Sequence, residues 1–125
     1  MSERIILKER NAAVVEAFFK ILRAKGASTA DAFEALRDAP APRFYVSRSV
    51  AWRVLSAMRK GKHLPVKEAN RQAMYKELMR RWRVRNYSQG AEFDAMLAEE
   101  APSFFLTIWR LKNIVYKNLR NGKEK

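Results

Sequence analysis

The sequence contains no cysteine, and its single histidine is His63. Disulfide bonds, thiolate catalysis and cysteine-based zinc sites are therefore excluded together, and the lack of cysteine suits a cytosolic protein. A Ser-His-Asp arrangement or a histidine-based metal site has little to build on, because His63 lies in the apparent linker "GKHLPVK". We expect His63 to be a solvent-exposed linker residue.

Other absences argue against an enzyme and against a membrane span. No run of about 18 apolar residues occurs, and the start "MSERIILKERN" lacks the long apolar core of a signal peptide. The four glycines lie mostly at expected helix boundaries rather than in a phosphate-binding loop. The acidic residues show no spacing typical of a paired general acid and base. We therefore expect a cytoplasmic protein that is not an enzyme and uses no cofactor or metal.

Positive charge is the most informative property of the composition. The 125 residues include 26 Lys and Arg against 13 Asp and Glu, which gives a net charge of +13 and a pI near 10.5. This excess favours a polyanionic partner. Nucleic acid is preferred over an anionic membrane surface, because the basic helices also carry apolar positions for a core. The length suits one domain or two very small ones, and 48% hydrophobic residues indicate a globular chain.

An internal repeat covers nearly the whole chain. The segment "APRFYVS" at 41–47 recurs as "APSFFLT" at 101–107, a shift of 60 residues. Chance similarity between two amphipathic helical regions is the alternative, but the match extends into the "AP-F" segment, where helical periodicity imposes nothing. The identical pairs are Ser28 and Ser88, Phe33 and Phe93, Ala35 and Ala95, Ala41 and Ala101, Pro42 and Pro102, and Phe44 and Phe104.

Each half of the chain predicts three helices. Apolar spacing and the positions of glycine, proline and hydroxyl residues place them at 3–25, 30–39 and 48–60, and again at 67–86, 89–99 and 108–121. Gly26 ends the first helix, Ser28 or Thr29 caps the second, and Ser47 and Thr107 cap the third helix of each half. No segment alternates with a period of two over a useful length. The predicted fold is all-α, with two tandem three-helix units at 1–62 and 63–125, and the alternative is that both pack as a single compact domain.

The charge is distributed unevenly along these helices. Residues 43–62 contain six Lys or Arg and no acid, and residues 103–125 contain six against Glu124. The short middle helices are acidic in both halves, since 27–42 and 87–102 carry most of their charge as Asp and Glu. A charge run is often only a solvated helix face, but the same bias in both third helices favours a binding surface.

Candidate nucleic-acid-binding residues follow from this bias. Arg and Lys bind phosphate, and Arg, Asn and Ser can read base edges in the major groove. Trp52 and Trp109 lie off the main apolar stripe, so each could contact sugar, base or the neighbouring repeat, or could fill the seam between the two units. The candidates are Arg43, Arg48, Ser49, Trp52, Arg53, Arg59, Lys60, Arg80, Arg81, Arg83, Arg85, Trp109, Arg110, Lys112, Asn113, Tyr116, Lys117 and Arg120.

Two stretches resemble the second half of a helix-turn-helix motif. These are "FYVSRSVAWRVL", preceded by "ALRDA", and "FFLTIWRLKNIVYKNL". The resemblance is to trihelical DNA-binding proteins of bacterial, phage or mobile-element type, including small regulators and terminase small subunits, and it covers about 28–60 and 88–121. It implies a third helix that enters the major groove, opened by Ser47 or Thr107. The connections "PAPRFYV" and "EAPSFFL" are several residues longer than the usual turn.

The sequence thus predicts a non-enzymatic nucleic-acid-binding protein, with duplex DNA as the favoured partner. The resemblance implies transcription regulation or an accessory role in phage or mobile elements, at the nucleoid. One alternative is a helical protein-interaction or oligomerisation module, and a homo-oligomer is compatible with the sequence. Another alternative is RNA binding, because bases can stack on Trp and Tyr.

Overall fold

The computed structural model describes residues 3–26, 28–62 and 66–123, and His63 lies outside the described residues. Within these ranges the chain is helical, and no strand longer than an isolated bridge occurs. The helices are α1 Glu3–Lys25, α2 Thr29–Arg37, α3 Arg48–Arg59, α4 Ala69–Val84, α5 Ala91–Leu97 and α6 Ile108–Lys123. The all-α prediction is confirmed, and the predicted helix bounds agree with the observed ones to within two residues.

Hydroxyl side chains start three of the helices, as the sequence indicates. The Ser28 hydroxyl accepts from the Asp31 backbone N–H at the start of α2, so Ser28 rather than Thr29 is the cap. Ser47 Oγ accepts the Val50 backbone N–H at 3.3 Å, and Thr107 Oγ1 accepts that of Arg110 at 3.1 Å. Each bond satisfies one of the backbone donors that a helix leaves free in its first turn.

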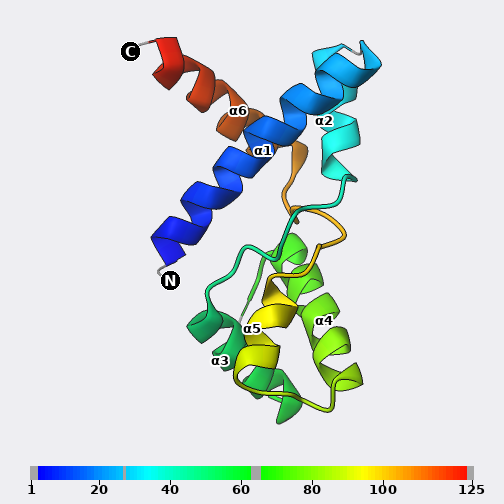
Figure 1. The fold of residues 1–125 in the computed structure, drawn as a ribbon, viewed down its shortest axis with the longest axis vertical. Helices are drawn as coiled ribbons and strands as arrows, with labels where there is room; N and C mark the ends of the chain where they lie inside the picture. The colour runs from blue at the N-terminus through cyan, green and yellow to red at the C-terminus, as the bar shows by residue number, and fades with distance from the viewer. Residues whose placement is uncertain (1–2, 27, 63–65, 124–125) are drawn as a thin grey trace.

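The helices form two groups, and each group takes helices from both halves of the chain (Figure 1). The first group contains α1, α2 and α6, in which α6 contacts both of the other helices. In the second group, α4 contacts α3 and α5. These contacts cross the predicted boundary between 1–62 and 63–125, because the third helix of each half packs against helices of the other half.

Two extended connections join the groups, and they lie side by side (Figure 1). Ala41 and Ala101 exchange two backbone hydrogen bonds, each 2.9 Å long, in an antiparallel bridge. Next to this bridge, the Tyr45 ring stacks on Phe104 with centroids 6.1 Å apart, and the Phe44 ring stacks on Phe105 at 6.2 Å. The connections exceed a helix-turn-helix turn in length because each carries the chain from one group to the other.

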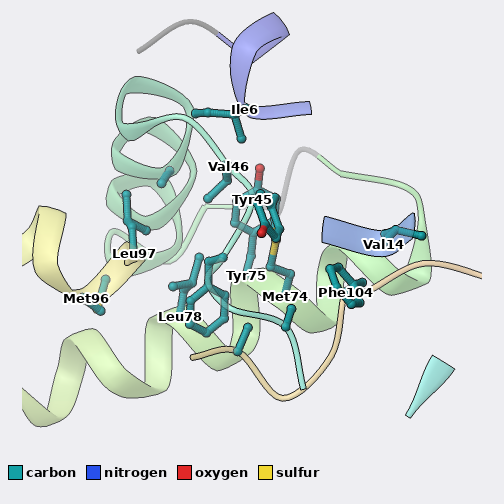
Figure 2. Packing of buried hydrophobic residues seen from close by; sticks show 14 of the residues in the cluster. Ile6, Val14, Tyr45, Val46, Met74, Tyr75, Leu78, Met96, Leu97 and Phe104 are labelled. Carbon is teal, nitrogen blue, oxygen red and sulfur yellow. The ribbon is translucent and has the colours of Figure 1, made fainter. Parts of the chain in front are cut away.

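The hydrophobic core is one buried cluster with members from all six helices. Figure 2 shows its central part, where Tyr45 and Val46 of the first connection lie among side chains of α1, α4 and α5. Trp82 of α4 is the largest fully buried side chain, and its indole N–H donates to the Ser88 carbonyl at 2.7 Å. The aromatic residues of the duplicated "AP-F" segment thus connect the two groups through the core.

Candidate nucleic-acid interface

The outward side of α6 carries basic residues from Arg110 to Arg120. Leu111, Ile114 and Val115 bury one side of the helix. No acidic residue occurs in α6, Ile108–Lys123. Among the candidates on this helix, Trp109 is 69% and Tyr116 46% exposed. The remaining α6 candidates are also exposed, namely Arg110, Lys112, Asn113, Lys117 and Arg120.

A groove of about 420 Å³ lies between α1 and α6. We call it the α1–α6 groove, and it contains three cationic and three amide side chains, with Ala12, Val15 and Ile114 as its apolar lining. None of the described residues that line it is acidic. The polar residues are Lys8, Asn11, Arg110, Asn113, Lys117 and Asn118. Lys and Arg are the side chains that bind phosphates, and Asn can form paired hydrogen bonds to adenine.

The opposite flank of α6 packs over α2. Lys112 Nζ lies 5.9 Å from the centroid of the Phe33 ring, and the Tyr116 ring meets the same ring edge-on at 5.8 Å. These contacts set the rotation of α6 about its own axis. With this rotation, Arg110, Asn113 and Lys117 face α1, where the groove forms.

The outward side of α3 is less available than that of α6. Arg48 forms an ion pair with Asp94 of α5 at 2.8 Å, and the Arg59 guanidinium lies 3.8 Å from the centroid of the Tyr87 ring. Ser49, Arg53 and Lys60 are exposed, and neither Arg53 nor Lys60 forms an ion pair in the described chain. Two of the four basic candidates on this helix and its C-cap are thus engaged within the molecule.

From the sequence, Trp52 and Trp109 could each contact a ligand or fill the seam between the two units. The structure gives them different roles. Trp52 is half-buried, and its ring meets Trp82 at 5.6 Å and Phe93 at 5.2 Å, both edge-on. It therefore packs α3 onto helices from the other half of the chain. Trp109 is mostly exposed at the start of α6, so it is the tryptophan that a ligand can reach.

Three of the four arginines in "MRRWRVR" are held by acidic side chains. Glu77 accepts hydrogen bonds from Arg80 at 2.9 and 2.8 Å and from Arg81 at 2.7 Å. The hydrogen bond from Arg80, followed by that from Arg81, lowers the pKa of Glu77 to about 2 against the opposing effect of burial. Arg85 pairs with Glu99, and Arg83 alone is exposed without an ion pair in the described chain.

Arg43 lies away from the outward faces of the helices. It is half-buried in the first connection, and its Nε donates to the Phe44 carbonyl at 3.1 Å. It lines a second pocket together with Arg110 and two arginines that were not among the sequence candidates, Arg10 and Arg71.

Several residues of the interface were missed from the sequence. Lys8, Asn11 and Asn118 line the α1–α6 groove, but the predicted grouping placed the first and last helices in separate units. Arg10 had a detectable signal, because it falls at helical spacing between buried Ile6 and Val14 on the apolar stripe of α1.

Within the described residues, no group of three or more His, Asp or Glu side chains could hold a metal ion. No described helix is both long and apolar enough to cross a membrane. Comparisons of the chain with protein-family models, with curated proteins and with solved structures find no significant match.

Proposed function

We propose that this protein binds duplex DNA without catalysing a reaction, through the basic side of α6 and the facing part of α1. The observation that carries the proposal is the α1–α6 groove, which contains Lys8, Arg110 and Lys117 among three amides and has no acid among its described lining residues. A groove with this charge attracts a polyanion, and its amides offer hydrogen bonds to base edges. The net charge of +13 adds long-range attraction.

The arrangement of the first group supports a helix-turn-helix-like unit with an exchanged helix. In this interpretation α1 and α2 supply the first two helices, and α6 takes the place of the third. The second group mirrors it, with α4 and α5 as the first helices and α3 as the third. The reciprocal bridge between Ala41 and Ala101 supports an approximate two-fold relation, because these residues are equivalent in the proposed repeat.

We expect the two helix groups to contribute unequally to DNA binding. Arg48 and Arg59 of α3 already have partners in the molecule, whereas Arg110 and Lys117 of α6 have no ion pair in the described chain. The Arg48–Asp94 pair is half-exposed and contributes at most about 1 kcal/mol, so giving it up opposes binding only slightly. We therefore assign the main interface to α6, and Arg53 and Lys60 of α3 to a secondary one.

A duplex-binding titration at low salt tests the proposal. The double variant Arg110→Glu/Lys117→Glu should weaken binding by at least about tenfold, because it places two negative charges beside the phosphates. The matched control is Lys20→Glu/Lys76→Glu, which changes net charge equally at exposed positions outside the groove. Equal losses in both variants would show that only net charge matters, and would contradict the assignment to α6.

A protein-interaction or oligomerisation module is the second candidate function. The observation in its favour is the exposure of three large apolar residues on α6, namely Trp109, Tyr116 and Leu119, of which Leu119 is 39% exposed. Size-exclusion chromatography with and without a duplex separates the two functions. A dimer that forms without DNA and dissociates on Trp109→Ala substitution would favour the interaction module.

RNA is the remaining alternative partner, since exposed aromatic residues can stack on unpaired bases. A competition assay tests this alternative. Duplex DNA, single-stranded DNA and structured RNA each compete with a labelled duplex for the protein. We expect duplex DNA to compete best, and stronger competition by structured RNA would assign the α1–α6 groove to RNA instead.

A further inference from the structure

A second pocket, of about 530 Å³, lies where the start of α6 meets α1, α4 and the two connections. We call it the arginine pocket, because Arg10, Arg43, Arg71 and Arg110 all line it, and Glu68 is the one acid among its described lining residues. These side chains come from four different segments of the chain. Its volume lies within the range of pockets that hold small molecules, roughly 300–1,000 Å³.

Arg10 is the unusual member of the arginine pocket. It is only 7% exposed, and no carboxylate lies within ion-pair distance of it in the described chain. Its Nε and Nη2 donate to Asn11 Oδ1 at 3.2 and 3.1 Å. A guanidinium has about five N–H donors, so its remaining donors bond to no other protein group in the described chain and can meet a ligand in the pocket. A buried charge without a counter-charge is costly, so an anion bound beside it would offset that cost.

The other arginines increase this cost. Burial, followed by the positive charges of Arg110 and Arg71, lowers the pKa of Arg10, while Glu3 and Glu68 act in the opposite direction. Glu3 already has a hydrogen-bond partner, since its carboxylate accepts the Ser47 backbone N–H at 3.2 Å. Arginine stays protonated in proteins, so the pocket holds more positive charge than its acids neutralise.

Arg43 and Arg71 also retain free donors. Arg43 donates to the Phe44 carbonyl, and Arg71 donates through Nη2 to the Tyr75 hydroxyl at 3.2 Å. Neither arginine has a carboxylate partner in the described chain. The planar donor fork of arginine matches the oxygens of a phosphate, and several forks around one cavity suit an anion with several oxygens.

We propose that the arginine pocket binds a phosphate group, with Arg10 as its most buried ligand and Arg43, Arg71 and Arg110 around it. The phosphate can belong to a small phosphorylated molecule or to the end of a DNA strand. Both sources present the same oxyanion to the arginines. The inference goes beyond duplex binding by the α1–α6 groove, because Arg10, Arg43 and Arg71 line the arginine pocket and not the groove.

Calorimetric titration of the full-length protein with inorganic pyrophosphate tests the inference. Arg10→Met should weaken pyrophosphate binding at least tenfold, while the protein without ligand stays folded, because Met fits the apolar stripe between Ile6 and Val14. Arg71→Gln should also weaken binding and does not depend on the tolerance of a buried position. The control is Arg23→Gln, an exposed α1 position outside the pocket, which should bind pyrophosphate as the wild type does.

A second measurement identifies the source of the phosphate. If the phosphate ends a DNA strand, a 5′-phosphorylated duplex should bind more tightly than its 5′-hydroxyl counterpart, and Arg10→Met should remove the difference. If it belongs to a small molecule, the two duplexes should bind equally while pyrophosphate still binds. The inference is overturned if pyrophosphate does not bind the wild type, or binds it no better than Arg10→Met and Arg71→Gln.

Discussion

At the scale of single residues, similar sequence positions acquire different roles from their surroundings. Trp52 and Trp109 were indistinguishable as candidates in the sequence, yet the first packs against Trp82 and Phe93 and the second is 69% exposed. Glu77 and Glu99 likewise differ from the other acidic residues, because two arginines donate to each of them.

Substitution of Trp52 should destabilise the fold much more than substitution of Trp109. Trp52→Ala should lower the free energy of unfolding by about 3 kcal/mol, because it removes ring contacts from the core. Trp109→Ala should change it by less than about 0.5 kcal/mol, as is usual for exposed positions. Urea unfolding of both variants measures the difference. Equal destabilisation would contradict the assignment of Trp52 to the core and Trp109 to the surface.

Glu77 should make stability depend on acid pH. Its pKa in the folded protein is about 2, below the ordinary value of 4.5, so its ionised form stabilises the fold above pH 4.5. That contribution is lost as pH falls from 4.5 toward 2. Glu77→Gln should therefore be less stable than the wild type at pH 7, and its stability should fall less steeply with acid.

Urea unfolding at several pH values checks the Glu77 prediction. Glu34→Gln is the control, because Glu34 is exposed and forms no ion pair in the described chain. Parallel stability curves for wild type and Glu77→Gln would show that the arginine pairs do not contribute.

At the scale of helices, the caps decide where α3 and α6 begin. Ser47 is 3% exposed and is tied twice, since its hydroxyl accepts from Val50 and its backbone N–H donates to Glu3. Thr107 makes the equivalent cap for α6 but is exposed. The first cap is therefore part of the packed structure, and water can replace the second more easily.

Removing the caps should destabilise the protein unequally. Ser47→Ala should lower the free energy of unfolding by about 1–2 kcal/mol, since the Val50 N–H loses its partner where little water can replace it. Thr107→Ala should cost about 0.5 kcal/mol. Ser49→Ala, at an exposed position within α3, is the control and should have little effect. Denaturant titration would contradict this account if Thr107→Ala were the more damaging change.

The helices and their caps were predictable because their signals are local. Gly26 lies at φ 56° directly after α1, a conformation that glycine adopts without strain. The partners of the third helices were not predictable in this way. The apolar stripe of Val50, Val54 and Leu55 fits any complementary face, so it does not specify whether α3 packs on α1 or on α4.

The candidate site was also only partly predictable, because some of its residues come together only through tertiary packing. The basic bias of α6 was visible in the sequence, and its residues are exposed in the structure. The groove was not visible, because it requires Lys8 and Asn11 from a helix about one hundred residues earlier in the chain. The pairs of Arg80 and Arg81 with Glu77 are local, at spacings of three and four residues within α4, and could have been found from the sequence. The pair of Arg85 with Glu99 depends on tertiary packing and could not.

At the scale of the whole molecule, the crossed contacts make the halves depend on each other. Residues 1–62 contain α1, α2 and α3 but lack α6 and α4, which those helices contact. The core cluster also takes members from all six helices. A fragment that ends in the linker therefore loses most of the partners of its third helix.

Dividing the chain at the linker tests this dependence. The fragments 1–62 and 63–125 should each show little cooperative unfolding alone, because each exposes apolar faces that the other half covers. Mixed in equal amounts, they should regain helical circular dichroism as a one-to-one complex. If each fragment unfolds cooperatively alone and mixing changes nothing, the predicted tandem units are independent and the crossed packing is contradicted.

The salt dependence of duplex binding tests the central claim most directly. The logarithm of the binding constant should fall linearly with the logarithm of salt concentration, with a slope of about 0.9 for each neutralised phosphate. The variant Arg110→Gln/Lys117→Gln should reduce the steepness of that slope by about 2, because two phosphate contacts of α6 are removed. An unchanged slope in this variant, or no binding of the wild type to any duplex at low salt, would contradict DNA binding through α6.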